Sequence, residues 1–261
     1  MAILENAIDQ LNRAEAIIED AIGQLRAEEV PKTDQPRGMA RTLRRVAILG
    51  AGTMGARVAA HFANAGVPSL LLSRPNTKDA NRNATALKGI DNAFKQRPGA
   101  FFNEEGKRLV KAGNFEDNLN DLAECDWIVE TVAEDLQIKR DLWRKVEAVC
   151  KADAILSTCT SGIPLSMITE GFSHQFRAHF LGTHFFNPPR YLHLLEVIPG
   201  AETDPGVVAF VRDCADRRLG KGVVLCKDTS NFIANRVAAS LAPPFRNSPW
   251  KATSPSRKRT R

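Results

Sequence analysis

The stretch Arg45-Val-Ala-Ile-Leu-Gly-Ala-Gly-Thr-Met-Gly55 decides the fold class of this 261-residue chain. Its apolar first half predicts a short buried strand, and helical periodicity follows over residues 53–65. Between them, glycines at 50, 52 and 55 form the pattern Gly-x-Gly-x-x-Gly. A strand, a glycine loop and a helix in this order are typical of dinucleotide-binding folds, in which the helix N-terminus faces the phosphates.

Each glycine has a distinct role in such a loop. Gly50 would permit the tight turn, Gly52 would let the backbone approach a pyrophosphate, and Gly55 would let the helix pack close to the strand. A glycine turn without a ligand is the alternative, and the flanking strand and helix favour dinucleotide binding over it. The candidate cofactor-binding residues of the loop are therefore Gly50, Gly52, Thr53, Met54 and Gly55.

The end of the next predicted strand, Ser69–Leu72, departs from the usual pattern of NAD sites. Those sites carry an Asp or Glu at the end of the second strand, about 20 residues after the glycine motif, where it binds the ribose hydroxyls. Here Ser73 and Arg74 stand at that place, and no acidic residue lies between Gly50 and Asp79. An arginine there can hold a 2′-phosphate, which favours NADP. The alternative is a lost acid that only weakens NAD binding, and both interpretations stay open.

Strands and helices alternate along the rest of the chain. Short apolar runs predict strands over residues 125–130, 154–157, 179–186, 194–198 and 222–226. Helical periodicity predicts helices over residues 80–97, 104–112, 135–150 and 204–218, with a new helix beginning in 232–241. This alternation is typical of an α/β fold with a Rossmann-type, doubly wound and mostly parallel sheet.

Both ends of the chain differ from this central region. Residues 2–28 predict one amphipathic helix with a short heptad stripe, which either packs on its own domain or docks on a partner. Residues 31–43 are typical of a linker, and residues 243–261, rich in Pro, Ser and Arg, predict a disordered basic tail. The predicted divisions are residues 1–43, a dinucleotide-binding domain at 44–227, the start of a helical domain at 228–242 and the tail at 243–261.

Composition narrows the class of protein. Hydrophobic residues make up 43% and charged residues 25%, as in soluble globular proteins, and no apolar run approaches the length of a membrane span. The net charge of +6 equals the six basic residues of 237–261, which holds no acids, so nucleic-acid binding through this tail is a minor alternative. Five cysteines without C-x-x-C spacing predict reduced thiols in a cytoplasmic protein and no metal site.

The segment Thr183-His-Phe-Phe-Asn-Pro-Pro189 carries the candidate catalytic group. His184 ends one apolar strand, and Glu196 lies twelve residues later, within the next. Adjacent strands can bring the two side chains together, and a carboxylate beside an imidazole fixes its tautomer and stabilises its protonated form. The pair would suit a general base acting on an alcohol. A hydrogen-bonded core histidine is the alternative.

From about Arg44 to about Val237, the chain resembles the 3-hydroxyacyl-CoA dehydrogenase family, and most of all its bacterial long-chain, multidomain members. The Asn-Pro pair after His184 is a specific signature at this distance from Glu196 and Asn235. The motifs that carry the resemblance are Gly50–Gly55, Cys125–Glu130, Lys139, Ser157–Leu165, His184–Pro188, Leu195-Glu196 and Phe232–Arg236.

The resemblance implies a reaction and a role for each matched residue. His184 would take the proton of a 3-hydroxyl group while C3 passes a hydride to NAD, which gives a 3-ketoacyl-CoA in fatty-acid β-oxidation. Glu196 would orient His184, and Ser161 and Asn235 would hydrogen-bond the substrate oxygen and the histidine. The implied substrate is an acyl-CoA, and members of the family are usually dimers. The matched cofactor contacts are Glu130 and Lys139.

Three replacements and the length of the chain depart from the family pattern. Ser73 replaces the acid, Cys159 replaces the first residue of Asn-Thr-Ser, and Ser230-Asn231 replaces Pro-Gly, whose glycine often serves a backbone geometry that side chains resist. After Asn235 the family continues with a helical domain that supplies dimer contacts and one wall of the acyl-CoA cleft. We therefore expect a C-terminally truncated, impaired enzyme. The alternative is a non-catalytic dinucleotide-binding module whose N-terminal helix binds a partner.

Overall fold

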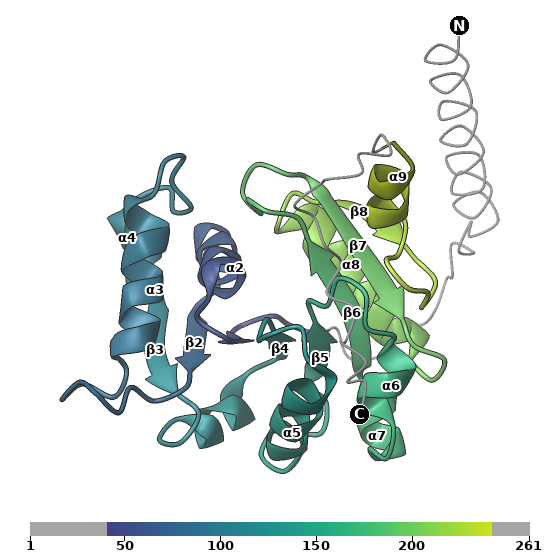
Figure 1. Ribbon diagram of the computed structural model, residues 1–261, viewed down its shortest axis with the longest axis horizontal. Coiled ribbons are helices and arrows are strands. Elements are labelled where there is room, and N and C mark those ends of the chain that lie inside the picture. Colours follow the sequence, from purple (N-terminus) through teal and green to yellow (C-terminus); the bar gives the residue numbers. More distant parts are fainter. Residues whose placement is uncertain (1–40, 242–261) are drawn as a thin grey trace, which may run out of the picture. The chain divides into compact units, whose positions relative to one another are not determined.

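The computed structural model describes residues 41–241 (Figure 1). They belong to two compact units, which divide between Phe232 and Ile233. The first unit holds the whole sheet, and the described part of the second is helix α9 (Ala234–Leu241). The helix predicted over residues 2–28 and the predicted tail at 243–261 lie outside the described residues.

The sheet has eight strands in the order β3-β2-β1-β4-β5-β6-β7-β8. All neighbours are parallel except β6 and β7, which run antiparallel. The first six strands have the order of a doubly wound dinucleotide-binding sheet, so the predicted fold class is confirmed. The strands are β1 (Val46–Leu49), β2 (Ser69–Ser73), β3 (Val110–Asn114), β4 (Trp127–Glu130), β5 (Ile155–Thr158), β6 (Phe180–Phe185), β7 (Leu194–Pro199) and β8 (Gly222–Leu225).

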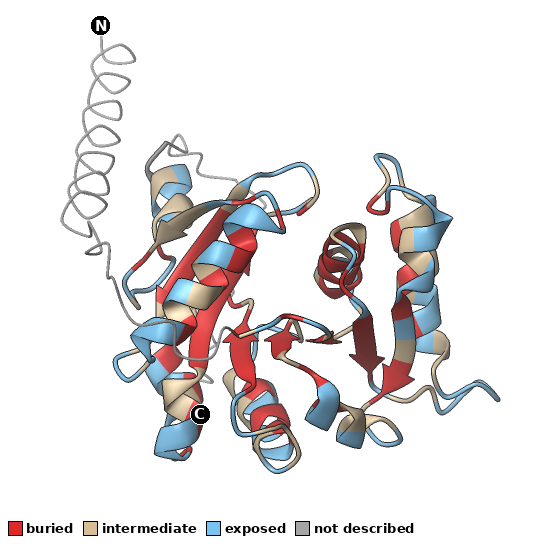
Figure 2. Ribbon diagram, turned by 180° about the vertical axis from the view of Figure 1, so that it is seen from behind, coloured by how far each residue is buried: buried red, intermediate tan, exposed pale blue. Residues whose placement is uncertain are grey.

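Helices cover both faces of this sheet, which leaves its central strands buried (Figure 2). One face packs against α2, α3 and α8 in a continuous apolar core. On the other face, Trp143 of α5 packs edge-on against Phe176 of α7 and Phe180 of β6. The helices of this unit are α2 (Thr53–Asn64), α3 (Ala84–Lys95), α4 (Glu104–Arg108), α5 (Leu136–Glu147), α6 (Leu165–Thr169), α7 (His174–Ala178), α8 (Pro205–Arg217) and the 3-10 helix η1 (Leu119–Glu124).

Local sequence explains where the longer helices begin. Asp135 accepts a hydrogen bond from the backbone N–H of Ile138 and so caps α5. Asp204 does the same for α8 through the N–H of Gly206, and proline stands in the first turn of that helix. Capping residues thus set the start of both helices.

The helix predicted over residues 104–112 is wrong in its second half. Helix α4 ends at Arg108, and Val110–Asn114 forms strand β3 at the edge of the sheet, parallel to β2. Val110 is buried and Lys111 is exposed, the alternation of a strand with one face covered. Gly113 fits this strand because a Cβ there would lie 2.7 Å from Leu72 Cδ2.

Candidate active site

The glycine loop has the geometry expected of a phosphate-binding turn. Gly50 has φ +116°, a conformation that favours glycine. A Cβ on Gly55 would lie 1.8 Å from Gly50 O, so only glycine lets α2 approach β1 this closely. A Cβ on Gly52 would meet nothing within 4 Å. The space in front of Gly52 is therefore open to a ligand.

The N-terminus of α2 fits a pyrophosphate. No side chain caps it, and its first turn carries no acidic residue. Its first N–H groups and the positive end of the helix dipole therefore suit an anion. Thr53 is exposed at this end, and Met54 is half-buried against the core. A hollow of about 420 Å³ extends from here to α3; it is lined by Ala51, Gly52, Thr53, Ala56, Arg57, Gly89, Asn92, Ala93 and Gln96.

Ser73 and Arg74 lie next to this loop. The N–H of Gly50 donates to Leu72 O at 2.8 Å, which holds the turn against the end of β2. Ser73 is buried, and its hydroxyl donates to Arg74 O at 3.0 Å. Arg74 is exposed.

His184 and Glu196 form a buried pair across β6 and β7. They are direct partners in the antiparallel register, and His184 Nδ1 lies 2.7 Å from Glu196 Oε2. Their residues are only 6% and 1% exposed. An ionised carboxylate can only accept hydrogen bonds. In the neutral form of the imidazole, Nδ1 is therefore the protonated nitrogen and Nε2 has the lone pair.

Ser161 lies beside this pair, at the place that the resemblance to the family implies. It follows β5, and its Oγ lies 3.3 Å from His184 Nε2. The structure therefore brings together three of the four predicted catalytic residues. Asn235 lies on α9, in the second unit, and its role at the substrate oxygen stays a prediction.

Aromatic rings enclose the imidazole of His184. The ring of Phe186 lies 4.5 Å away and that of Phe232 lies 5.8 Å away, between centroids. Asn231 and Phe232 both have positive φ, +65° and +46°. Asn231 stands where the family has glycine, and asparagine is among the side chains that adopt this conformation most readily. The special geometry expected at this position is present.

Glu130 and Lys139 form an ion pair that is fully buried. Lys139 Nζ lies 2.8 Å from Glu130 Oε1, and both side chains are 0% exposed. Thr158 Oγ1 and the N–H of Val132 also donate to this carboxylate, at 2.6 and 2.7 Å. The hydrogen bond from Val132 ties the loop after β4 to this pair. The contact of the pair with the cofactor stays a prediction.

Glu134 is the accessible carboxylate of the same network, and sequence analysis missed it. It accepts hydrogen bonds from the Thr160 hydroxyl and from the N–H of Ser161, the latter at 2.9 Å, and it lies 3.4 Å from Lys139 Nζ. Its side chain is 44% exposed. Desolvation would raise its pKa, but the Lys139 ammonium and these hydrogen bonds outweigh that effect and lower the pKa of Glu134. Its only sequence signal is its place just before the α5 cap.

Arg57, on the second turn of α2, is another residue that the sequence did not single out. Its guanidinium donates to Asn187 Oδ1 and, through Nε at 2.9 Å, to Gln96 Oε1. Asn187 belongs to the loop that follows the catalytic strand β6. Arg57 thus ties the helix of the glycine loop to the loop beyond His184.

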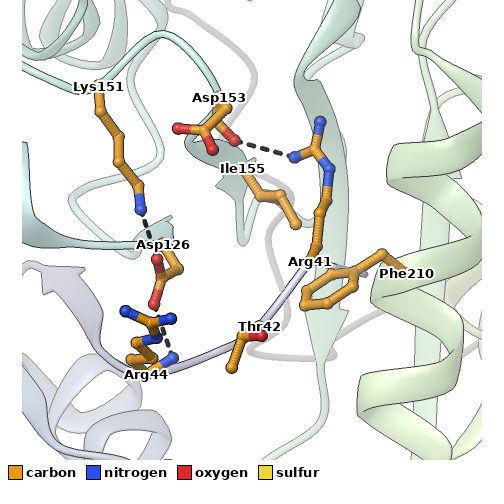
Figure 3. A pocket seen from close by; sticks show the side chains of 8 residues that line it. All are labelled: Arg41, Thr42, Arg44, Asp126, Lys151, Asp153, Ile155 and Phe210. Atoms are coloured by element: carbon orange, nitrogen blue, oxygen red, sulfur yellow. Dashed lines mark hydrogen bonds and ion pairs between the residues drawn. The ribbon is translucent and has the colours of Figure 1, made fainter. Parts of the chain in front are cut away.

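A second hollow lies at the amino end of the central strands and holds no candidate site. It has a volume of about 290 Å³ and lies near Asp126 and Ile155, where β4 and β5 begin (Figure 3). The candidate catalytic residues lie at the opposite, carboxyl end of β5 and its neighbour β6. Within the hollow, Asp126 accepts from the N–H of Arg44 and from the Lys151 ammonium. Its carboxylate is therefore already neutralised.

The cysteine thiols of the described residues give no sign of a reactive nucleophile. Burial raises the pKa of Cys159 to about 11 and that of Cys125 to about 12, so these thiols stay protonated. Across residues 41–241, all five cysteines are free and no cluster of ligands suits a metal ion. In the same range, no helix has the length and hydrophobicity to span a bilayer.

A doubly wound sheet, an uncapped glycine-loop helix and a carboxylate-supported histidine are typical of one class of protein, the nicotinamide-dependent oxidoreductases. Residues 45–229 match the family described as "3-hydroxyacyl-CoA dehydrogenase, NAD binding domain". The chain belongs to this family. The predicted family, fold and NAD-binding domain are thereby confirmed.

Curated relatives and solved structures agree with this placement. A probable 3-hydroxyacyl-CoA dehydrogenase of Deinococcus radiodurans is 49% identical over 195 residues, which are 75% of this chain and 56% of the relative. One of Bacillus subtilis is 43% identical over 213 residues, 76% of this chain and 27% of the relative. The crystal structure of 3-hydroxybutyryl-CoA dehydrogenase from Escherichia coli K12 matches with a TM-score of 0.65 at 29% identity, covering 76% of this chain and 41% of that one. The chain thus spans about half, or about a quarter, of the two curated relatives.

Proposed function

We propose that this chain catalyses the NAD(P)-dependent oxidation of 3-hydroxyacyl-CoA thioesters to 3-ketoacyl-CoA, a step of fatty-acid β-oxidation. The observation that carries the proposal is the buried contact of 2.7 Å between His184 and Glu196, with Ser161 beside the other ring nitrogen. The names of the two curated relatives support the same reaction.

In this proposal, His184 is the general base. Its Nε2 takes the proton of the 3-hydroxyl group, while the hydrogen on C3 leaves with its electron pair and the C3–O bond becomes a carbonyl. The nicotinamide cofactor supplies the hydride acceptor when bound. Glu196 accepts from Nδ1–H and stabilises the positive charge that develops on the ring. The Ser161 hydroxyl donates to the substrate oxygen as negative charge builds there.

Other residues hold the participants in place. Glu130 and Lys139 stay proposed cofactor contacts, as the resemblance to the family implies. We add Glu134, because it is both accessible and hydrogen-bonded to the loop of Ser161. Asn235 is proposed to take part, with Ser161, in the hydrogen bonds to the substrate oxygen and to His184 that the resemblance implies. The partner is an acyl-CoA, and dimer formation and a cytoplasmic location stay predictions.

The test is the reverse reaction followed by absorbance at 340 nm with acetoacetyl-CoA and, in parallel, NADH or NADPH. We expect turnover in the unaltered chain and a loss of at least about 10³-fold in His184→Ala, with circular dichroism to show that both are folded. An unchanged rate in His184→Ala would refute the catalytic assignment. Binding of either cofactor without turnover in the unaltered, folded chain would instead favour the non-catalytic dinucleotide-binding module.

A further inference from the structure

The carboxyl end of β2 lacks an acceptor for ribose hydroxyls. Ser73 is buried, and its own hydroxyl is turned to Arg74 O at 3.0 Å. Its neighbour in the β3 register, Asn114, is also buried, and its amide donates to Asn83 Oδ1 and Asp117 Oδ2. Neither residue is an acid, so neither Ser73 nor Asn114 can offer a carboxylate to the ribose hydroxyls.

The two acids that follow β3, the neighbour of β2, are paired with another cation. Glu116 and Asp117, which follow β3, both form ion pairs with the guanidinium of Arg82, with Asp117 Oδ1 at 2.6 Å. These contacts pair one oxygen of each carboxylate with Arg82. No hydrogen bond or ion pair within residues 41–241 involves the Arg74 side chain.

Arg74 is also held in position by its neighbours. The carbonyl of Leu72, two residues earlier, accepts from the N–H of Gly50 at 2.8 Å, which places this segment beside the glycine loop. Pro75 follows directly and restricts Arg74 to extended backbone conformations. An exposed guanidinium on a restricted backbone, next to a phosphate-binding turn, suits a second phosphate group.

We propose that Arg74 binds the 2′-phosphate of a dinucleotide, so that this chain prefers NADP(H) to NAD(H). The proposal rests on dinucleotide binding by the glycine loop, which is part of the proposed function. It makes Arg74 and Ser73 the residues that determine cofactor specificity. It also explains why this chain lacks the acid that would repel a 2′-phosphate.

The test uses two fragments that differ only in the group at issue, 2′,5′-ADP and 5′-AMP, titrated into the full chain by isothermal calorimetry. We expect 2′,5′-ADP to bind roughly 10- to 100-fold more tightly, as for a charge-assisted contact with a guanidinium. Arg74→Ala should remove this difference and leave 5′-AMP binding unchanged. Ser73→Asp should reverse the preference. Arg144→Ala, which removes an exposed arginine from α5, is the matched control.

Equal binding of the two fragments, or an equal loss of both in Arg74→Ala, would overturn the proposal and favour a lost acid that only weakens NAD binding. If neither fragment binds, equilibrium dialysis with NADPH and NADH makes the same comparison and decides in the same way. Neither measurement needs an acyl-CoA or His184. The same titrations in His184→Ala therefore separate a failure of this proposal from a failure of the dehydrogenase assay.

Discussion

His184 Nδ1 and Glu196 Oε2 lie 2.7 Å apart because their strands, β6 and β7, are the one antiparallel pair in the sheet. The reversal after Phe185 returns the chain beside its own histidine and sets the register that aligns the two residues. The carboxylate is 1% exposed, so water does not compete for the imidazole N–H.

Replacing Glu196 tests how much this contact contributes to catalysis. We expect Glu196→Gln to lower kcat by about 10²- to 10⁴-fold with little change in KM, because the neutral amide no longer stabilises the charge that forms on His184. Steady-state kinetics with acetoacetyl-CoA measure both constants. Glu202→Gln, at an exposed carboxylate paired with Arg177, is the control. A kcat within twofold of the unaltered chain would argue against the role of Glu196.

The glycine loop predicts two different outcomes for one type of substitution. Gly55→Ala should lower the free energy of unfolding by roughly 3 kcal/mol or more, because the added Cβ would lie 1.8 Å from Gly50 O. Gly52→Ala should change it by no more than about 1 kcal/mol yet weaken dinucleotide binding at least about tenfold. Urea denaturation and calorimetric titration measure the two effects. Equal losses of stability would contradict the open space at Gly52.

The buried pair of Lys139 and Glu130 should dominate the stability of its region. Lys139→Met leaves a carboxylate uncompensated in the interior, so we expect a loss of roughly 3–5 kcal/mol in the free energy of unfolding. Adding Glu130→Gln to that variant should restore part of the loss. The exposed ion pair of Arg144 and Asp141 is the comparison, with a loss of about 1 kcal/mol or less in Arg144→Met. Similar losses at both positions would be inconsistent with full burial of Lys139.

His61 should make the fold sensitive to mild acid. Burial, and secondly the charge of Lys221, lower its pKa from 6.5 to about 4, and its Nδ1 is buried without a partner among the described residues. Between these values the unfolded chain binds a proton that the folded chain does not. The free energy of unfolding should therefore fall as pH drops from 6.5 to 4, by up to about 3 kcal/mol. Denaturation at several pH values measures how steeply the free energy of unfolding depends on pH. This dependence should be shallower in His61→Gln than in the unaltered chain, and an identical dependence would exclude His61 as the cause.

The left-handed backbone at Asn231 predicts an order of stability. Asn231→Gly should be as stable as the unaltered chain or more stable by up to about 1 kcal/mol, whereas Asn231→Ala should lose roughly 1 kcal/mol, because a Cβ is disfavoured at φ +65°. Thermal unfolding compares the three chains. Alanine as stable as glycine at this position would show that the conformation relaxes without cost.

The elements that sequence analysis placed well are those with strong local signals. The run before Gly50 is wholly apolar because β1 is covered on both faces, and the glycines mark its turn. Strand β3 carries no such signal: it is an edge strand in which Lys111 faces solvent and Gly113 has no side chain to reveal a pattern. Its five residues followed a charged helix closely enough to look like a continuation of it.

The residues of the candidate site also differ in how strong a signal each leaves in the sequence. His184 and Glu196 were predictable because each lies within an apolar strand where a charged group is unusual, and the resemblance to the family added Ser161. Glu134 and Arg57 are ordinary surface charges in the sequence, and only the fold turns them towards the loops of Ser161 and Asn187. Residues that act through tertiary contacts leave little trace in a single sequence.

Each of the two apolar layers that flank the sheet contains one tryptophan, Trp127 of β4 in one and Trp143 of α5 in the other. Trp127 packs edge-on against Phe62 of α2 and donates to Ser157 Oγ at 2.8 Å, whereas Trp143 lies among phenylalanines on the other face. The third, Trp250, lies outside the described residues. With Trp250 and one of the other two replaced by phenylalanine, the emission of the remaining indole would report on a single layer. The chain thus contains its own pair of optical probes, which can tell whether both layers assemble in one step or in sequence.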